Sequence, residues 1–367
     1  MKTVALWGYY GYGNVGDEAL LAAAIELLGE VHLKIFMGPE PSIDPLKNFE
    51  FIDRRPNLLS QVIKKSDMFM LGPGGLLHDR IKPQATYYHL AGPILARAYH
   101  KPYCAIGQQI GPFYRKMTKM LVKMALSRAS FVTVRDKTSQ TESRNIGINT
   151  TLSADMAFIL KPSDPNKELK DKISSLPRPR FIFAPAIDPR WTPSKQRSAD
   201  IINHLLQKTQ GSVVLIPFFP NKDDNYIKDL TPLLPKNQTL VLSSPIRWQD
   251  AFGVFTMCDF SVPMRLHAVI ASALANVPAL PIPYYPKVTV IANEIGYKHM
   301  ISHDDEDWSS KCDVFLTRMN EIRDTLKITL PEMVGRVKIT KNLLQRFLYE
   351  LVQDSTRHHL STILPCL

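Results

Sequence analysis

The distribution of hydrophobic residues predicts short buried strands that alternate with amphipathic helices. The first strand covers residues 2–9, and a helix with one apolar face follows it over residues 17–28. The alternation continues with predicted strands at 32–38, near 51, and at 67–71, 102–113 and 130–136, and with predicted helices at 86–100 and 115–128. Strand, glycine turn and helix in repeated order are typical of a doubly wound parallel sheet.

The same pattern restarts after residues 166–180, which are rich in proline, lysine and aspartate and predict a linker. Strands are expected at 181–187, 212–219, 239–245 and 259–262, and helices at 195–209 and near residue 224. We therefore expect an α/β protein with two doubly wound Rossmann-like domains that face a cleft, a glycosyltransferase-B-like (GT-B-like) architecture. The domains cover 1–165 and 181–330, and a helical tail covers 331–367.

The stretch 258–287 carries the strongest local signal for a ligand site. After the strand at 259–262, a helix rich in small residues is expected over 265–275, and a second strand over 279–284. Arg265 and His267 fall where the first strand ends and the helix begins. Free N–H groups at a helix start, an arginine and a titratable imidazole can hold a phosphate or a carboxylate. The alternative is a salt bridge and a hydrogen-bonded histidine.

Other predicted strand ends carry polar side chains as well, and we expect them to converge on one cleft. For each glycine turn, chain geometry alone is the alternative explanation. The polar positions at these turns are Asn14, Asp17, His78, Asp79, Gln108, Gln109, Arg135, Asp136, Asp155, Arg265, His267 and Lys287.

Composition narrows the class of partner. The chain has 367 residues, enough for two domains, and a formal charge of +11, which favours anionic partners. No nucleic-acid-binding pattern is present, so nucleic acid is not expected. The start of the chain lacks a signal-peptide pattern, no apolar run is long enough to span a bilayer, and the four cysteines are widely spaced. These features predict a cytoplasmic protein.

Seven motifs, taken in order, resemble those of the polysaccharide pyruvyl transferases, among them the CsaB-like enzymes of bacterial cell walls. They are GYYGYGNVGDEAL, GPGGLLHD, GQQIGPF, VTVRDKTS, SADMAF, MRLHAVIASALANVP and YYPKV. The resemblance covers most of the chain, from Met1 to about Gly296. Tyr285 stands where the YDPK-type motif of the family has aspartate. The resemblance implies transfer of a pyruvyl group from phosphoenolpyruvate to a sugar, which forms a ketal.

The implied substrates are phosphoenolpyruvate and a cell-wall or surface polysaccharide, or its lipid-linked precursor. This chemistry requires no metal, and no other cofactor is expected. The resemblance also implies roles for residues. His267 is expected to act as general acid or to stabilise phosphate, and Asp17 to act as base. Donor-binding candidates are Arg265, Arg135, Lys287 and Leu266; acceptor-binding candidates are Asn14, Gly16, His78, Asp79 and Gln108.

The residue types agree with these roles, because arginine binds carboxylate or phosphate through two parallel hydrogen bonds and imidazole can deliver a proton near neutral pH. Each role has a structural alternative. Asp17 could serve only as a helix N-terminal residue, Lys287 could be a solvated lysine, and Arg135 could form a salt bridge with Asp136 or Asp155.

The helix expected at 115–128 has methionines on one face and lysines on the other. Such a helix could meet a lipid-linked acceptor at a membrane surface, and the alternative is a helix with a core face and a solvated face. Two other functions stay open: a nucleotide-sugar glycosyltransferase of the same architecture, with Glu294 as its ribose-binding acid, and a non-catalytic relative. The oligomeric state is not predicted.

Overall fold

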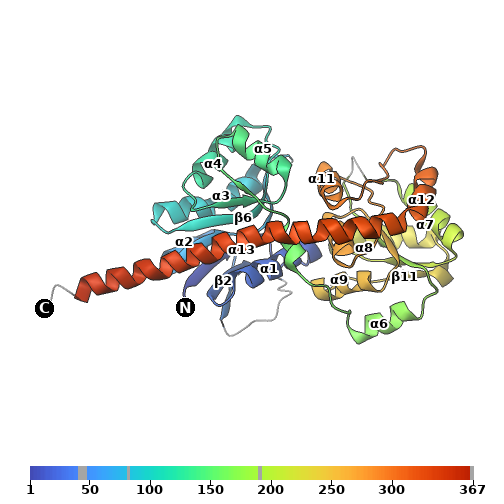
Figure 1. The fold of residues 1–367 in the computed structure, drawn as a ribbon, viewed down its shortest axis with the longest axis horizontal. Coiled ribbons are helices and arrows are strands. Elements are labelled where there is room, and N and C mark those ends of the chain that lie inside the picture. Colours follow the sequence, from blue (N-terminus) through green and yellow to red (C-terminus); the bar gives the residue numbers. More distant parts are fainter. Residues whose placement is uncertain (40–47, 81–82, 189–191, 364–367) are drawn as a thin grey trace. The chain divides into compact units, whose positions relative to one another are not determined.

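The chain folds into two compact units in a computed structural model that describes residues 1–39, 48–80, 83–188 and 192–363, the last of these (354–363) by backbone alone. The first unit comprises residues 1–12, 20–156 and the end of the chain from Val334 (Figure 1). The second comprises residues 13–19 and 157–333. The second unit therefore takes a short piece from the N-terminal part of the chain.

The first unit is built on a sheet of parallel strands in the order β3-β2-β1-β4-β6-β7-β8, with β5 paired to β6. The strands are β1 (Thr3–Trp7), β2 (His32–Met37), β3 (Phe49–Asp53), β4 (Met68–Leu71), β5 (Gly74–Leu77), β6 (Tyr103–Ile110), β7 (Val132–Val134) and β8 (Thr151–Leu152). The order reverses between β1 and β4, as in a doubly wound fold. The helices are α1 (Val15–Leu28), α2 (Pro56–Lys65), α3 (Pro83–Ala98), α4 (Lys116–Leu126) and α5 (Lys137–Asn145).

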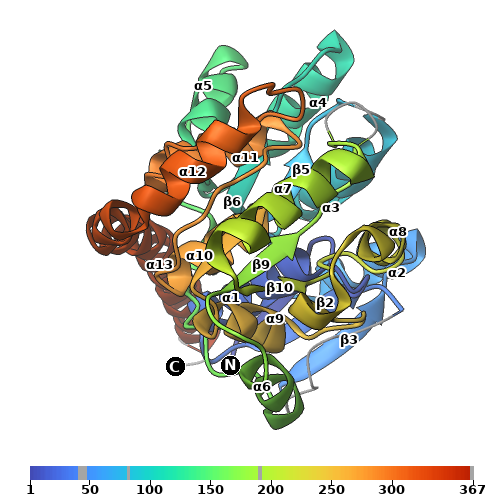
Figure 2. The ribbon, with the colours of Figure 1, turned by 90° about the vertical axis from the view of Figure 1, so that its right-hand side faces the viewer.

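The second unit has a smaller parallel sheet in the order β11-β10-β9-β12, of which Figure 2 labels β9 and β10. Its strands are β9 (Arg180–Ala184), β10 (Ser212–Leu215), β11 (Thr239–Val241) and β12 (Phe260–Pro263). Its helices are α6 (Lys167–Ser174), α7 (Lys195–Thr209), α8 (Lys222–Leu230), α9 (Trp248–Thr256), α10 (Leu266–Leu274), α11 (Pro286–Ile295) and α12 (Trp308–Thr317), with short 3₁₀ helices at Met156–Ile159, Thr231–Leu233 and Lys236–Gln238. Central strands are buried on both faces, which explains their continuous apolar runs.

Three predicted segments have a secondary structure other than the one expected. The predicted linker 166–180 contains α6, which Asn166 caps by accepting a hydrogen bond from the Leu169 amide, 3.1 Å. The predicted glycine turn at 72–79 contains β5, because its backbone pairs with β6 despite two glycines. The predicted strand at 279–284 is reduced to a single bridge between Ser261 and Ala279.

The helix α4 exposes its methionines. Thr118, Val122, Ala125 and Leu126 form its buried face, whereas Met117 and Met120 are each 55% exposed and Met124 is 42% exposed. The helix thus has a core face and a solvated face, and the methionines lie on the solvated one. The core side of α4 is made of smaller residues, because α3 lies against it.

The long C-terminal helix α13 (Met319–Ile363) begins well before the tail predicted at 331–367, and Pro331 lies inside it. Residues up to Met333 belong to the second unit and the rest to the first. In the first unit, the Thr340 hydroxyl lies 3.1 Å from that of Thr133 and 2.9 Å from that of Ser153, and the guanidinium of Arg336 donates to the Ser153 carbonyl. Buried hydrogen bonds thus join α13 to β7 and to the end of β8.

We expect Thr340→Val to lower the free energy of unfolding by about 1–3 kcal/mol, because two buried hydroxyls then lose a partner. Thr325→Val on the same helix is the control, since the Thr325 hydroxyl bonds only to the Glu321 carbonyl one turn earlier. Chemical denaturation of both variants measures the difference. Equal stability of the two variants would show that the buried hydroxyl network does not hold α13.

Candidate functional site

The start of α1 is part of the second unit, and it lies against the start of α10. The Val15 amide donates to the Phe218 carbonyl at 2.9 Å, and the Asn14 side-chain oxygen accepts from the Gly16 amide at 3.0 Å. A Cβ atom added to Gly16 would lie 2.0 Å from His267 Nδ1. Only glycine leaves room for the imidazole here, so two motifs some 250 residues apart in sequence meet at one point.

A buried ion pair anchors the same region. Arg265 is the N-cap residue of α10, and its Nε donates to Asp223 Oδ2 at 2.7 Å while its Nη2 donates to Oδ1. The Asp223 carboxylate is 0% exposed and also accepts from the backbone amides of Phe218 and Phe219, at 3.0 and 2.8 Å. The salt-bridge alternative for Arg265 is thus observed, but in the interior rather than on the surface.

The charged groups of this cluster shift one another's pKa values. Burial opposes the charge on Arg265, yet Asp223 outweighs it and raises the arginine pKa, with further contributions from Tyr284 and Asp17. For Tyr284, burial opposes ionisation, but Lys287 and Arg265 together lower the pKa of the phenol. Lys287 stands in the first turn of α11, with its Nζ 6.0 Å from the Tyr284 ring.

The cluster therefore combines an anchored guanidinium, an ammonium group, a phenol, an imidazole and the Asp17 carboxylate within one unit. We call it the α10 cluster and define it as Asp17, Asp223, Arg265, His267, Tyr284 and Lys287. Such a set can bind a small dianion and move protons. The predicted residues Asn14, Gly16 and Leu266 belong to the same unit, and Leu266 is buried in α10.

Arg135 lies elsewhere, in the interior of the first unit. Its side chain is 2% exposed and lies 3.3 Å from the Asp136 carboxylate and 3.6 Å from that of Asp155, while its Nη2 donates to Gln109 at 2.6 Å. The salt-bridge alternative describes this geometry, with both carboxylates at once. Donor binding by Arg135 stays a prediction that these contacts do not favour.

The other acceptor candidates also lie in the first unit. Asp79 is 0% exposed and accepts from the Tyr114 and Arg115 amides, at 2.7 and 2.9 Å. Burial would raise its pKa, but these bonds prevail and lower it. Gln108 is likewise buried and donates to the Ile106 carbonyl at 3.0 Å, and half-buried His78 is bonded to Thr86. The burial of Asp79 and Gln108 does not favour contact with a sugar, and acceptor binding by them stays a prediction.

Sequence reasoning missed Asp223 and Tyr284. Asp223 is one of several acidic residues at the start of α8, and nothing local indicates that its partner lies 42 positions away. Tyr284 is three positions before Lys287, and the motif comparison considered only its neighbour Tyr285. Tyr285 is the N-cap residue of α11 and makes no capping hydrogen bond. An aspartate at this position would be a favourable N-cap residue. The aspartate of the YDPK-type motif therefore has a structural role that Tyr285 does not fill.

Comparison with known families identifies the chain. A family model described as polysaccharide pyruvyl transferase matches residues 14–285, most of the chain. The chain belongs to the polysaccharide pyruvyl transferase family. The match begins at Asn14, in the segment that joins the second unit, and ends at Tyr285, beside Lys287. A search of curated proteins gives no significant match.

Solved structures similar to this pyruvyl transferase family member share its fold at low identity. Staphylococcus aureus MnaA with UDP has a TM-score of 0.62 at 12% identity and covers 94% of this chain and 98% of its own. Anabaena Alr3699/HepE with UDP has a TM-score of 0.60 at 13% identity, and the match covers 96% of this chain and 100% of that protein's chain. A Listeria monocytogenes protein described as a UDP-N-acetylglucosamine 2-epimerase has a TM-score of 0.62 at 11% identity. That match covers 95% of this chain and 94% of the other. These matches confirm the predicted GT-B-like fold class.

Two searches of the described residues bear on the remaining predictions. No three histidine, cysteine, aspartate or glutamate side chains among them gather into a possible metal site. In the same part of the chain, no helix is both long and apolar enough to cross a bilayer. The roles of the candidate residues in this family member stay predictions, which the contacts of the α10 cluster make specific.

We expect Asp223→Asn to destabilise the second unit by about 3–5 kcal/mol, because it leaves the Arg265 guanidinium buried without its counter-charge. Asp229→Asn makes the same change at an exposed pair with Lys195 and should change stability little. Thermal unfolding of both variants compares them. If both behave like the wild type, the Asp223–Arg265 pair is not the anchor of this region.

Proposed function

We propose that this protein transfers a pyruvyl group from phosphoenolpyruvate to a saccharide and forms a ketal. Membership of the family supports the reaction class. The contact between Gly16 and His267 is the observation that carries the assignment of the site, since it brings the helix start that bears Asp17 to the helix start that bears Arg265. The two helix starts are then next to one another, and the start of a helix is a place where an anion can bind.

The reaction defines what the site must do. Protonation of C3 of phosphoenolpyruvate makes C2 electrophilic, and a sugar hydroxyl attacks C2. The C2–O bond to phosphate breaks, and a second hydroxyl of the sugar closes the ketal at C2. The two hydroxyl protons balance the proton delivered to C3 and the one taken up by phosphate, so no oxidant or metal is needed.

In this proposal Lys287 and the remaining N–H groups of Arg265 bind the phosphate and carboxylate of the donor. His267 supplies a proton or stabilises the departing phosphate, and Asp17 accepts the proton of the sugar hydroxyl. Asp223 is a positioning residue, because its carboxylate is fully occupied by Arg265 and two amides. Tyr284 lies beside that ammonium group, whose charge helps to lower the pKa of the phenol.

Phosphate release from phosphoenolpyruvate in the presence of a panel of saccharide acceptors tests the proposal, with mass spectrometry for the added pyruvyl group. We expect His267→Ala to reduce the rate by roughly 10²–10⁴-fold, as for loss of a proton-transferring group. Gly16→Ala should also reduce it by about 10²-fold, because the new methyl group displaces the imidazole.

Gly335→Ala is the matched control, since a Cβ there meets nothing within 4 Å. It should leave the rate unchanged. A wild-type rate in His267→Ala would remove His267 from the mechanism, and the absence of pyruvyl transfer to any acceptor would leave a binding protein without turnover.

The structural neighbours raise a second candidate, a UDP-sugar enzyme, because two of them are complexes with UDP. Glu294, the acidic candidate for a ribose, lies near the end of α11, seven residues and so roughly 10 Å along the helix from Lys287. Thermal stabilisation by UDP-sugars without stabilisation by phosphoenolpyruvate would favour this function over pyruvyl transfer.

We also propose that α4 and the turn before it dock on an anionic membrane surface from the cytoplasmic side. Tyr114 is 71% exposed and adjoins the exposed methionines of α4. The lysines Lys116, Lys119 and Lys123 are exposed on the same helix. Apolar side chains that can enter the headgroup region, next to basic ones that attract acidic lipids, are the features of an interfacial helix.

Co-sedimentation with vesicles tests the docking surface. We expect binding to vesicles that contain phosphatidylglycerol, little binding to phosphatidylcholine alone, and loss of binding in the triple variant Met117→Ser, Met120→Ser, Met124→Ser. The double variant Lys64→Gln, Lys65→Gln on α2 is the control for charge elsewhere. Binding that is unaffected by the methionine substitutions would place any membrane contact on another surface.

A further inference from the structure

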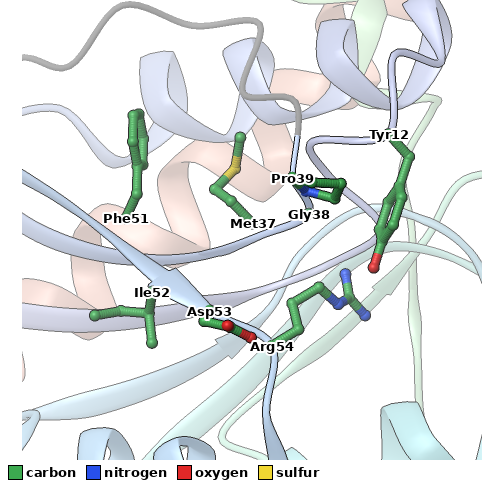
Figure 3. A pocket seen from close by; sticks show the side chains of 8 residues that line it. All are labelled: Tyr12, Met37, Gly38, Pro39, Phe51, Ile52, Asp53 and Arg54. Carbon is green, nitrogen blue, oxygen red and sulfur yellow. The ribbon is translucent and has the colours of Figure 1, made fainter.

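A pocket in the first unit is lined by residues other than those assigned above. It has a volume of about 350 Å³, near the lower end of the ~300–1,000 Å³ range of ligand pockets. Its walls follow the carboxyl ends of three neighbouring strands, β1, β2 and β3 (Figure 3). The lining residues are Tyr12, Met37, Gly38, Pro39, Phe51, Ile52, Asp53 and Arg54. In open α/β sheets this edge is where ligands bind.

Arg54 is a buried cation at this pocket. It is 8% exposed, and its guanidinium carbon lies 4.7 Å from the Trp7 ring centroid, 5.7 Å from that of Tyr12 and 5.4 Å from that of Tyr88. Its Nη1 donates to the Gly8 carbonyl. Among the described residues, no carboxylate forms an ion pair with it. Buried charges are normally paired, so this guanidinium is suited to an anion supplied by a ligand.

The neighbouring histidine does not change this balance. Burial and then the charge of Arg54 lower the pKa of His89 to about 3, and its Nδ1 accepts from the Trp7 indole N–H at 3.0 Å. The imidazole is therefore neutral. Asp53, the carboxylate in the pocket wall, is paired with Arg55 at 3.2 Å and accepts from the Arg55 amide. Of the charges of His89, Asp53 and Arg54, the positive charge of Arg54 is therefore the one that acts on a ligand in the pocket.

Tyr12 gives the pocket a rigid flat wall. Its ring stacks on that of Tyr9, with centroids 4.6 Å apart and planes 16° apart. Figure 3 shows the Tyr12 and Arg54 side chains extending toward one another. An aromatic face packs well against the C–H face of a pyranose ring, and phenol and carboxylate oxygens can hydrogen-bond to its hydroxyls.

We propose that this pocket binds a saccharide unit that carries a carboxylate or phosphate, with the ring on Tyr12 and the anion on Arg54. That the bound saccharide is the acceptor of pyruvyl transfer rests on the proposed function; the binding itself does not. The site makes the substrate class specific, since a neutral sugar would leave the guanidinium without its anion.

Isothermal titration calorimetry with the full chain tests the pocket. The probes are methyl glucoside, glucuronic acid, glucose 1-phosphate and inorganic phosphate. We expect at least one acidic sugar to bind roughly tenfold or more tightly than methyl glucoside, because charge-assisted hydrogen bonds are added. It should also bind more tightly than inorganic phosphate, which lacks the ring. Tighter binding of glucuronic acid than of glucose 1-phosphate indicates a carboxylate ligand, and the reverse order indicates a phosphate ligand.

Variants then assign the contacts. Arg54→Gln should weaken the binding of the acidic sugar roughly tenfold or more without changing the binding of methyl glucoside. Tyr12→Ala should weaken the binding of both sugars. Arg97→Gln is the charge-matched control, because Arg97 is exposed at the end of α3, before the amino end of β6. If Arg54→Gln does not fold, Tyr12→Ala and Tyr12→Phe test the pocket instead. Only Tyr12→Ala removes the stacking ring, so only that variant should lose most of the sugar binding.

Three results would overturn the proposal: no binding of any sugar, equal binding of acidic and neutral sugars, or unchanged affinity in a folded Arg54→Gln variant. In each case Arg54 serves only to hold the Gly8 carbonyl. Thermal stabilisation by phosphoenolpyruvate, measured in Arg54→Gln and the wild type, separates the two proposals. Thermal stabilisation by phosphoenolpyruvate without binding of an acidic sugar rejects only the proposal for this pocket. Binding of an acidic sugar without stabilisation by phosphoenolpyruvate rejects only the proposal of pyruvyl transfer.

Discussion

The Asp223 carboxylate is the constraint on which the α10 cluster depends. It accepts from the Phe218 and Phe219 amides and from two nitrogens of Arg265. A fully buried carboxylate is costly unless it is paired and hydrogen-bonded. The two amide bonds hold the loop after β10 on the first turn of α8, and the two bonds from Arg265 join that turn to the start of α10. The Phe218 carbonyl then accepts from Val15, which fixes the start of α1 beside His267. One ion pair thus sets the positions of three elements.

Two arginines of this protein show why residue type alone does not define a site. Arg265 and Arg135 both follow a short strand, and both pair with buried aspartates. Arg265 neighbours a lysine, a phenol and a histidine that can act on a ligand, whereas Arg135 is surrounded by Asp136, Asp155 and Gln109. Arg54 is a third case, a buried cation with aromatic neighbours and a pocket at its side. Their different partners separate a structural role from a binding role.

Apolar runs bounded by glycine and proline predicted most strands of both sheets, because strands buried on both faces must be apolar throughout. The helix over 195–209 was predicted with the bounds that α7 has. The failures have local causes. β5 contains two glycines and so lacks a strand pattern, α6 lies in a polar segment, and α4 carries its large apolar residues on the exposed face. In each of these segments, tertiary contacts rather than propensity decided the structure.

The sequence by itself determined the parallel α/β class, the family, and the grouping of Arg265, His267 and Lys287 within 23 positions of the chain, because these follow from local periodicity and ordered motifs. Only the tertiary structure decided that residues 13–19 belong to the second unit, that Asp223 is the partner of Arg265, and that Asp79 and Gln108 are buried. Those facts depend on which distant segments the hydrophobic cores bring together. No pattern along the chain records a contact between residues 42 or 250 positions apart, so the partners of a charged side chain appear only once the cores have formed.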